Sequence, residues 1–235
     1  MIAIFGFGKM GKTVVAQLDE KCLVIEPNRS LWQEDGNLYV CTPNESSVRP
    51  DVIIDFSRHD AIGIVCDYAR GHRVPLVVAT TGHTREEQEC IRQCAAVVPV
   101  YWAANVAYGM RHFANACASL AASMPLADIE IEEIHSQDKL DRPSGTALYL
   151  ADRMRKARAC STIGKQSRNE ISIRSVREGD VKGTHIVRYG LQGECITLTH
   201  RALSRDIFAK GALSAAKWLI DQPAGLYGLE DRSDI

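Results

Sequence analysis

A glycine-rich turn near the start of the chain constrains the fold more than any other feature of the sequence. The apolar residues 2–5 predict a short strand, and the residues that lead to Leu18 predict a helix. Between them, Gly6, Gly8 and Gly11 form the motif Gly-x-Gly-x-x-Gly. The first glycine permits a tight turn, the second lets the backbone approach a pyrophosphate, and the third lets helix and strand pack closely. A strand, this motif and a helix, in that order, predict a dinucleotide-binding domain of the Rossmann type.

An acidic residue follows the motif at the distance where such domains bind a ribose. A second apolar strand, at residues 22–25, ends in Glu26, which lies 20 residues after Gly6. A carboxylate there accepts hydrogen bonds from both hydroxyls of an adenine ribose and repels a 2′-phosphate. We therefore expect NADH to be at least as good a cofactor as NADPH, although the nearby cations Lys9, Lys12 and Arg29 could compensate for Glu26.

Apolar strands and helical segments continue to alternate up to about residue 105. Further strands are predicted at residues 51–55, 75–79 and 97–101, and further helices at residues 59–70 and 85–95. This alternation predicts a parallel sheet with right-handed crossovers, which binds ligands beyond the carboxyl ends of its strands. Residues 32–48 show no clear helix, so we expect a shortened connection there.

The stretch from residue 132 to residue 147 carries the side chains best suited to chemistry. His135 supplies an imidazole, which titrates near neutral pH, and Lys139 adds a full positive charge. Alternating apolar and polar residues at 129–134 predict a strand that leads into them. These two side chains therefore suit proton transfer to an anionic ligand.

A helix is predicted to begin directly after this polar stretch. Residues 146–154 are rich in good helix formers, and Ser144 is a candidate N-cap. The backbone N–H groups of Gly145 and Thr146 would then point outward at the positive end of the helix dipole, which favours an anion. For Ser144 taken alone, simple capping is an equally good interpretation.

The composition excludes several classes of protein. The net charge is −1 and the sequence pI is about 6.7, so there is no basic field for nucleic acid or an anionic membrane. No apolar run reaches transmembrane length, and the first residues lack a signal-peptide layout, so we expect a cytoplasmic location. The 8 cysteines include no Cys-x-x-Cys pair and the 7 histidines show no ligand spacing, so we expect reduced thiols and no metal site.

The pattern changes after residue 105, which indicates a second domain. A helix is predicted at 111–124, alternating strands at 170–176, 183–189 and 194–200, and a last helix at 206–219. We expect residues 1–105 and about 206–235 to form the dinucleotide-binding domain, and residues from about 106 to 205 to form the substrate-binding and oligomerisation domain. The fold class is therefore α/β, with a Rossmann-type parallel sheet plus a smaller α+β domain that has a mixed or antiparallel sheet.

The second sheet is expected to join copies of the chain. Apolar and polar residues alternate along its strands, so one face of the sheet should be covered by helices. The other face, with apolar and aromatic members, should stay open. Such a face on a small domain requires a partner, which predicts a homo-oligomer. His185 and His200 lie on these strands and are interpreted as structural or interface residues.

The stretch that begins at His135 resembles the substrate-site signature of the 4-hydroxy-tetrahydrodipicolinate reductase family. That signature reads His-His-x-x-Lys-x-Asp-x-Pro-Ser-Gly-Thr-Ala, and residues 135–147 depart from it at Ser136, where the second His is replaced. The resemblance extends to Asp55-Phe56-Ser57, to Thr80-Thr81, to the Ala104-Asn105 turn and to the closing Gly-Leu-Tyr. It therefore spans essentially the whole chain.

The resemblance implies a reaction and a set of roles. The reaction is NAD(P)H-dependent reduction of 4-hydroxy-tetrahydrodipicolinate to tetrahydrodipicolinate, in diaminopimelate and lysine biosynthesis, by a homotetramer. His135 would be the proton donor and Lys139 the second catalytic residue. The small dicarboxylate substrate would be bound by Ser136, Ser144, Gly145 and Thr146. The residues expected to contact NADH or NADPH are Gly6, Gly8, Lys9, Met10, Gly11, Glu26, Asp55, Phe56, Ser57, Ala79, Thr80, Thr81, Ala104 and Asn105.

Two other functions are compatible with this architecture. A two-domain NAD(P)-dependent dehydrogenase of sugar-type alcohols would share it, but such enzymes usually carry a Glu-Lys-Pro-like loop, which this chain lacks. A dinucleotide-sensing module without turnover would need a surface for nucleic acid or a partner, which the neutral charge balance does not offer. It would also have no use for His135 and Lys139 beside an anion site.

Overall fold

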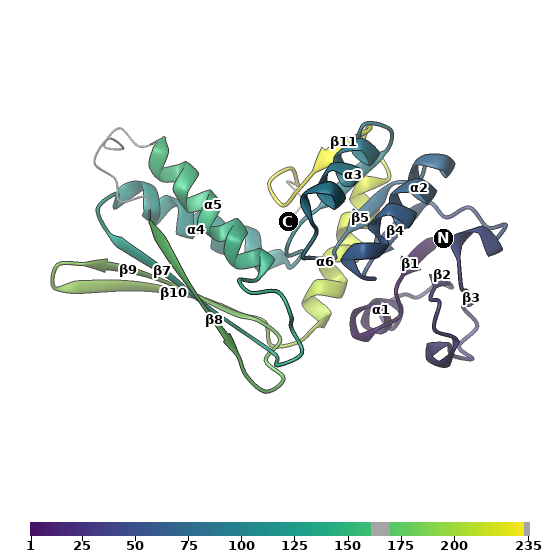
Figure 1. Ribbon diagram of the computed structural model, residues 1–235, viewed down its shortest axis with the longest axis horizontal. Coiled ribbons are helices and arrows are strands. Elements are labelled where there is room, and N and C mark those ends of the chain that lie inside the picture. The colour runs from purple at the N-terminus through teal and green to yellow at the C-terminus, as the bar shows by residue number, and fades with distance from the viewer. Residues whose placement is uncertain (161–169, 233–235) are drawn as a thin grey trace. The chain divides into compact units, whose positions relative to one another are not determined.

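The computed structural model describes residues 1–160 and 170–232, and the chain divides into two compact units (Figure 1). Unit 1 consists of Met1–Ala107 and Arg205–Ile235, and unit 2 consists of Tyr108–Ser204. Unit 2 is thus inserted between two segments of unit 1. Residues 233–235, which we expect in the dinucleotide-binding domain, lie outside the described residues.

Unit 1 is built on a parallel sheet of seven strands in the order β11-β6-β5-β4-β1-β2-β3. The strands are β1 (Ile2–Phe5), β2 (Leu23–Ile25), β3 (Leu38–Val40), β4 (Val52–Asp55), β5 (Leu76–Val78), β6 (Pro99–Trp102) and β11 (Gly225–Tyr227). The central strands are continuous apolar runs because both faces of the sheet are covered. The chain starts at β1 and winds outward in both directions, which is the Rossmann topology, so the predicted fold class is confirmed.

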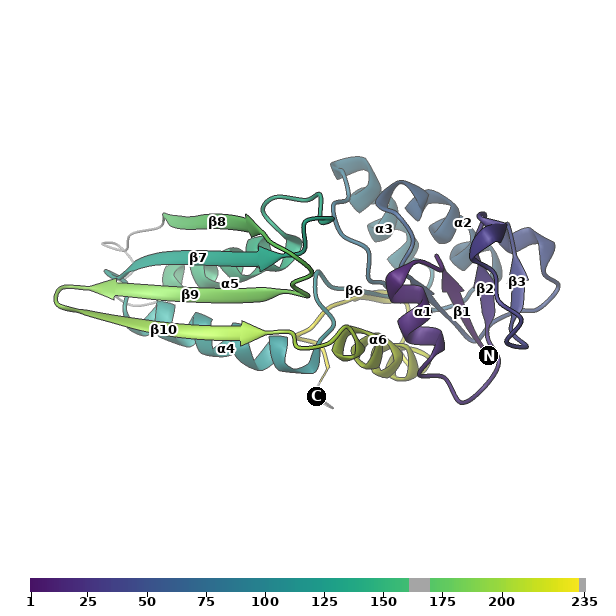
Figure 2. The same cartoon turned by 90° about the horizontal axis from the view of Figure 1, so that it is seen from below.

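Helices cover both faces of this sheet (Figure 2). They are α1 (Lys9–Val15), α2 (Ile62–His72), α3 (Arg85–Ala95) and α6 (Asp206–Leu219). Helices α2 and α3 pack on the face that carries Phe5, Ile53 and Leu76, and α6 packs against α1, β4, β5 and β6. Helix α6 approaches closely at Gly211, where an added Cβ would lie 1.8 Å from the Val106 carbonyl oxygen.

Unit 1 differs from the prediction in some of its short elements, which include the unpredicted strand β11. Helix α1 ends at Val15 instead of Leu18, because the chain tightens and the Gln17 and Leu18 amides donate to carbonyls three residues back. The segment 32–48 has no α-helix, as expected, but it contains β3, which we did not predict. This strand is a short apolar run at the partly exposed edge of the sheet, and no α-helix precedes it to mark it as the next strand of the alternation. Short 3-10 helices occupy Arg29–Leu31, Pro43–Glu45 and His59–Ala61.

Unit 2 is a mixed sheet of four strands with two helices on one face (Figure 2). The strands are β7 (Asp128–His135), β8 (Ile171–Arg177), β9 (Thr184–Leu191) and β10 (Glu194–Arg201), and the helices are α4 (Tyr108–Ser123) and α5 (Gly145–Ala159). In the order β10-β9-β7-β8, strand β7 is parallel to β8 and antiparallel to β9. The predicted mixed sheet is therefore confirmed.

The two faces of the second sheet differ in their chemistry. Ile131 and Tyr189 are fully buried under the helices, and the Tyr189 hydroxyl donates to the Cys117 carbonyl oxygen of α4 at 2.7 Å. On the other face, Arg188 lies 3.5 Å from Glu130 and 3.1 Å from Glu132. The expectation of aromatic members on the open face is thus wrong, because the aromatic side chain faces the helices and ion pairs cross the open side.

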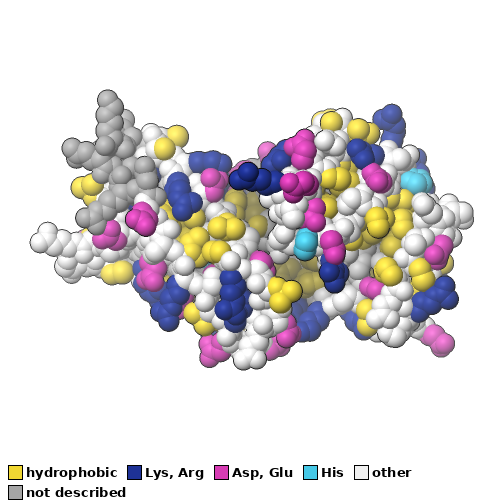
Figure 3. Space-filling model, viewed as in Figure 1, with side chains coloured by type: hydrophobic (Ala, Val, Ile, Leu, Met, Phe, Trp, Pro, Cys, Tyr) yellow, Lys and Arg dark blue, Asp and Glu magenta, His cyan; other side chains and the backbone are white. Residues whose placement is uncertain are grey.

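The surface carries no large field of one sign. On the face shown in Figure 3, Lys and Arg side chains are interspersed with Asp and Glu over both units, in keeping with the net charge of −1. Within residues 1–160 and 170–232, no helix is long and apolar enough to cross a membrane.

Candidate active site

The glycine motif forms the turn between β1 and α1. Gly6 has φ +86°, a conformation that favours glycine, and an added Cβ would lie 2.6 Å from the Ser57 Cα. At Gly11 an added Cβ would lie 2.0 Å from the Gly6 carbonyl oxygen, so this glycine allows helix and turn to touch. At Gly8 an added Cβ would meet nothing within 4 Å. The missing side chain of Gly8 therefore leaves an open cradle beside the turn, which suits a pyrophosphate.

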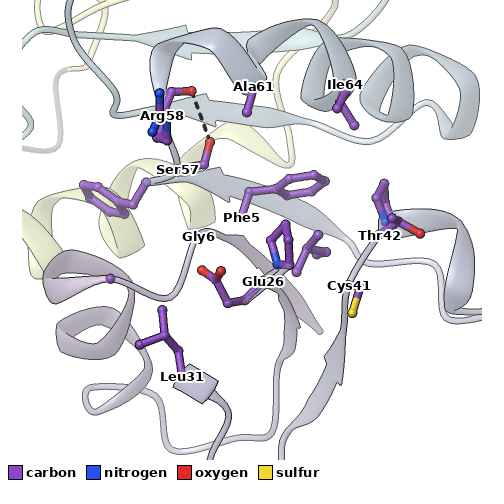
Figure 4. A pocket seen from close by; sticks show the side chains of 15 residues that line it. Phe5, Gly6, Glu26, Leu31, Cys41, Thr42, Ser57, Arg58, Ala61 and Ile64 are labelled. Atoms are coloured by element: carbon purple, nitrogen blue, oxygen red, sulfur yellow. Dashed lines mark hydrogen bonds between the residues drawn. The ribbon is translucent and has the colours of Figure 1, made fainter. Parts of the chain in front are cut away.

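A pocket of about 430 Å³ lies at this turn, lined by residues that include Gly6, Gly8 and Glu26 (Figure 4). Glu26 comes from the end of β2. Its carboxylate accepts hydrogen bonds from the backbone N–H groups of Phe7 and Asn28, each at 2.8 Å. The carboxylate is therefore held in place before any ribose arrives, which fits the group that the motif predicts.

Five of the residues expected to contact the cofactor line this pocket: Gly6, Gly8, Glu26, Phe56 and Ser57. The remaining expected residues, which do not line it, are Lys9, Met10, Gly11, Asp55, Ala79, Thr80, Thr81, Ala104 and Asn105. The sequence analysis missed Arg58, which lines the pocket and forms a two-pronged contact with Asp60 at 3.1 and 3.0 Å. Its place in the loop shortly after the end of β4 was the available signal.

Asp55 and Thr80, near the ends of β4 and β5, are buried in unit 1 and joined by a hydrogen bond. The Thr80 hydroxyl donates to the Asp55 carboxylate at 2.9 Å and lies 3.0 Å from Nε2 of His83. Burial raises the pKa of Asp55, against the hydrogen bonds from Ser57 and Thr80, which lower it. Burial also lowers the pKa of His83. These polar groups hold the strand ends in place, and the sequence analysis did not identify His83.

His135 lies at the end of β7 and is paired with a buried carboxylate. Its Nδ1 contacts the Glu133 carboxylate, and the Glu133 side chain is 0% exposed. Burial by itself raises the pKa of Glu133, but hydrogen bonds from His135, Ser175 and Arg177 outweigh it and bring that pKa down to about 2. On the other side of the ring, an added Cβ at Gly183 would lie 3.2 Å from Nε2 of His135. Gly183 therefore leaves room at the second ring nitrogen.

Lys139 lies in the loop after β7, where both its side chain and its backbone have polar partners. Its Nζ is 2.7 Å from an Asp141 carboxylate oxygen, and its carbonyl oxygen accepts a hydrogen bond from Arg177 Nε at 3.1 Å. Its N–H donates to the Ser136 carbonyl oxygen at 3.1 Å, which closes a turn. The structure thus brings together His135, at the end of β7, and Ser136 and Lys139, in the loop that follows. The peptide bond between Arg142 and Pro143 in this loop is cis.

The N-terminus of α5 begins beside this loop. The Ser144 hydroxyl accepts a hydrogen bond from the Ala147 N–H at 3.3 Å, so the predicted N-cap is confirmed. The Ser144 N–H donates to Glu133 at 3.3 Å, and the Ser144 hydroxyl lies 3.4 Å from Nε2 of His185. Burial, with a smaller contribution from His135, lowers the pKa of His185 to about 3, so His185 is neutral and can accept from Ser144. Gly145 and Thr146 are the first helical residues, as expected.

Sequence reasoning missed three members of this cluster: Glu133, Arg177 and His185. Glu133 had a signal, because the pair Glu132-Glu133 interrupts the strict alternation of β7 and places a charge on the face that buries Ile131. Arg177 and His185 come from β8 and β9, and only the folded sheet brings them to β7. Among the described residues, no group of three or more His, Cys, Asp or Glu side chains is placed to hold a metal ion.

Two family models together match almost the whole chain. The model described as "Dihydrodipicolinate reductase, N-terminus" matches residues 1–106, and the one described as "Dihydrodipicolinate reductase, C-terminus" matches residues 109–232. The chain belongs to the dihydrodipicolinate reductase family. The predicted family, the NAD(P)H-dependent enzyme class and the reductive step of diaminopimelate and lysine biosynthesis are thereby confirmed.

Individual relatives agree with this assignment. The chain is 34% identical to a 4-hydroxy-tetrahydrodipicolinate reductase of Clostridium novyi, over 95% of this chain and 94% of the relative, and 37% identical to one of Campylobacter jejuni, over 98% and 97%. A solved, dipicolinate-bound dihydrodipicolinate reductase from Paenisporosarcina is 27% identical, with a TM-score of 0.73 over 98% of each chain. A myo-inositol dehydrogenase from Corynebacterium glutamicum, at 14% identity and a TM-score of 0.61 over 95% of this chain and 89% of its own, shares the fold alone.

Proposed function

We propose that unit 1 binds the NADH or NADPH of this reductase and that unit 2 binds its dicarboxylate substrate, 4-hydroxy-tetrahydrodipicolinate, around His135. The observation that carries the proposal is the cluster in which a carboxylate-paired imidazole, a lysine and a helix N-terminus occur together. The dipicolinate-bound relative supports it, because dipicolinate is a planar ring with two carboxylates. The nicotinamide supplies the hydride when it is bound.

His135 is the proton donor in this proposal. Hydride addition to a ring carbon places negative charge on the adjoining ring atoms, and a positioned acid must then deliver a proton. With Nδ1 occupied by Glu133, Nε2 is the nitrogen that can carry the proton to the substrate. The small Gly183 beside Nε2 keeps that edge of the ring accessible.

The substrate carboxylates are bound by two kinds of positive group. One carboxylate meets the N–H groups of Gly145 and Thr146 at the start of α5, where the helix dipole favours an anion. The other substrate carboxylate binds Lys139. It would either displace Asp141, which pairs with Lys139 in this structure, or share the lysine with it. Ser136 contributes a neutral hydrogen bond at the position where the family signature has a second His.

In unit 1, Glu26 and the glycine turn bind the adenosine half of the cofactor. The pocket beside them has room for an adenosine, and the Glu26 carboxylate is already oriented by two backbone N–H groups. The open cradle at Gly8 suits the pyrophosphate. Because Glu26 repels a 2′-phosphate, the proposal includes NADH as a cofactor at least as good as NADPH.

The proposal extends to assembly and location. We expect a homotetramer joined through the open face of the second sheet, where the ladder of Glu130, Glu132 and Arg188 offers charges of both signs to another copy. All 8 cysteines are free thiols, as in proteins of a reducing compartment, which supports the cytoplasm as the location.

A spectrophotometric assay tests the proposed function. The purified chain should oxidise NADH only when freshly prepared 4-hydroxy-tetrahydrodipicolinate is present, and dipicolinate should inhibit competitively with the substrate. A matched reaction with a sugar-type alcohol and NAD⁺ tests the dehydrogenase alternative. Turnover of the alcohol without turnover of the dicarboxylate would refute the proposal.

A further inference from the structure

A buried ion pair between Glu133 and Arg177 contacts residues of the proposed active site. The side chains of Glu133 and Arg177 are 0% and 3% exposed, and Arg177 Nη1 lies 3.0 Å from each oxygen of the Glu133 carboxylate. A buried pair of this kind contributes little net stability, because desolvation of both ions offsets their attraction. Its other contacts, which run to His135 and to the loop of Lys139, indicate what it does.

The carboxylate of Glu133 has four donors around it. Besides Arg177, it receives Nδ1 of His135, the Ser144 N–H at 3.3 Å and a hydrogen bond from Ser175. An acceptor at Nδ1 keeps a proton on that nitrogen, so the neutral imidazole has its lone pair at Nε2 and the charged imidazole has its mobile proton there. Glu133 thus selects the nitrogen that can exchange a proton with a ligand.

Arg177 connects the same carboxylate to the loop that carries Lys139. Its Nε donates to the Lys139 carbonyl oxygen at 3.1 Å, and its Nη2 donates to the Asp141 carbonyl oxygen. The guanidinium therefore holds the two backbone positions on either side of Leu140, a residue that is itself 93% exposed. A lysine side chain in this position could not form such a fork, because an ammonium lacks the planar arrangement of donors.

We infer that Glu133 and Arg177 are positioning residues: Glu133 orients His135 for proton donation, and Arg177 fixes the Lys139 loop against the same carboxylate. The inference rests on the proposed function, since it assigns what the pair does for two residues that act on the substrate. Neither residue touches the substrate in this scheme.

The charges that face His135 from other elements define the expected pH effect. Arg177 on β8 and Lys139 in the loop are cations and disfavour an imidazolium, and His185 on β9, whose ring centroid lies 5.2 Å from that of His135, is neutral. Glu133 on β7 provides the opposing negative charge. Neutralising Glu133 therefore leaves Arg177 unopposed beside His135, whereas Lys139 keeps its partner Asp141.

The pH dependence of kcat separates this role from a structural one. In the wild-type enzyme kcat should fall on the alkaline side as His135 loses its proton. In Glu133→Gln this alkaline limb should move to lower pH by about 1–3 units, the usual effect of an opposite charge at hydrogen-bond distance. The matched control is Asp152→Asn, which removes a carboxylate that pairs with Lys156 on the exposed side of α5 and should keep the wild-type limb. An unchanged limb in Glu133→Gln would overturn the role of Glu133.

The role of Arg177 is tested by Arg177→Lys, which keeps the charge but loses the fork. KM for the substrate should rise by roughly tenfold, as expected for two lost hydrogen bonds that position Lys139, while the alkaline limb should stay within a few tenths of a pH unit of wild type. A wild-type KM in this variant would overturn the role of Arg177.

A measurement on the unaltered protein covers the case in which Glu133→Gln does not fold. In wild-type protein labelled with ¹⁵N-histidine, the His135 signals are those absent from His135→Gln. Above the alkaline limb, their ¹⁵N shifts should show the proton on Nδ1, and a proton on Nε2 would overturn the inference. Because this readout needs no turnover, an enzyme that fails in the assay but retains the Nδ1 proton would refute the proposed function, while the orientation of His135 by Glu133 would still hold.

Discussion

Two glycines of the same turn should respond to alanine in different ways. Gly11→Ala places a Cβ 2.0 Å from the Gly6 carbonyl oxygen, whereas Gly8→Ala places one where no atom lies within 4 Å. The first change strains the folded protein itself. The second leaves the protein without ligand undisturbed and obstructs only the cradle that a pyrophosphate would occupy.

The expected magnitudes follow from these distances. A carbon and a carbonyl oxygen in ordinary contact are about 3.3–3.6 Å apart, so Gly11→Ala forces backbone movement of more than an ångström. Overpacking of this kind costs about 1–3 kcal/mol, which for a chain of this size lowers Tm by roughly 2–12 °C. Gly8→Ala should leave Tm unchanged but weaken NADH binding by about tenfold or more, since each 1.4 kcal/mol of lost contact is tenfold in Kd.

Thermal unfolding followed by circular dichroism, without cofactor, gives the first quantity, and titration of NADH fluorescence gives the second. The reasoning is refuted if Gly11→Ala melts with the wild-type protein. It is equally refuted if Gly8→Ala binds NADH with wild-type affinity, because the open space at this position would then not be the pyrophosphate site.

The remaining predictions concern the substrate loop, cofactor choice and acid stability. His135→Gln should lower kcat by about 10²–10⁴, the usual worth of a positioned acid, and Lys139→Ala should lower kcat and raise KM. Ser136→Ala should mainly raise KM, by about fivefold for one hydrogen bond of about 1 kcal/mol; loss of turnover in Ser136→Ala with little change in His135→Gln would contradict these roles. Because Glu26 repels a 2′-phosphate, kcat/KM with NADH should equal or exceed that with NADPH, and a preference for NADPH of about a hundredfold would overturn the assignment. Because burial lowers the pKa of His185 to about 3, the unfolded chain binds this proton more readily than the folded one. The free energy of unfolding should therefore fall as pH is lowered from about 6.5 towards 3, by up to about 1.4 kcal/mol per pH unit from this group; urea unfolding midpoints that stay constant over this range would contradict the effect.

The elements that sequence reasoning located best carry their own local signals. Helix α3 spans Arg85–Ala95 as predicted, because Thr84 and Glu87 form a reciprocal capping box at its start. Helix α6 spans Asp206–Leu219 as predicted, since its apolar residues recur at helical spacing. Strands β3 and β11 lie at the two edges of their sheet and are partly exposed, so they lack the fully buried apolar run that marks the equally short β2 and β5.

The candidate site likewise contains residues that carry a local signal in the sequence and residues that do not. His135 and Lys139 could be proposed as site residues from residue type, because few side chains titrate near neutrality or carry a fixed positive charge beside a helix N-terminus. Glu133 and Arg177, which hold these two residues in place, could not be proposed in this way. Glu133 resembles a solvent-facing strand residue until the face it occupies is known, and Arg177 lies 44 residues further along the chain. The pairing of β7 with β8 brings them together.

The insertion of unit 2 into unit 1 has a consequence for the order of events during synthesis. Helix α6 and strand β11 leave the ribosome after all of unit 2, yet α6 packs against β4, β5 and β6, which were made about 100–150 residues earlier. At about 5–20 residues per second, those strands wait several seconds or more with one face uncovered, while all of unit 2 is already available to fold. The sheet of unit 1 therefore keeps apolar surface exposed while unit 2 is made, and a ribosome that stalls before residue 206 would release a complete unit 2 and an unfinished unit 1.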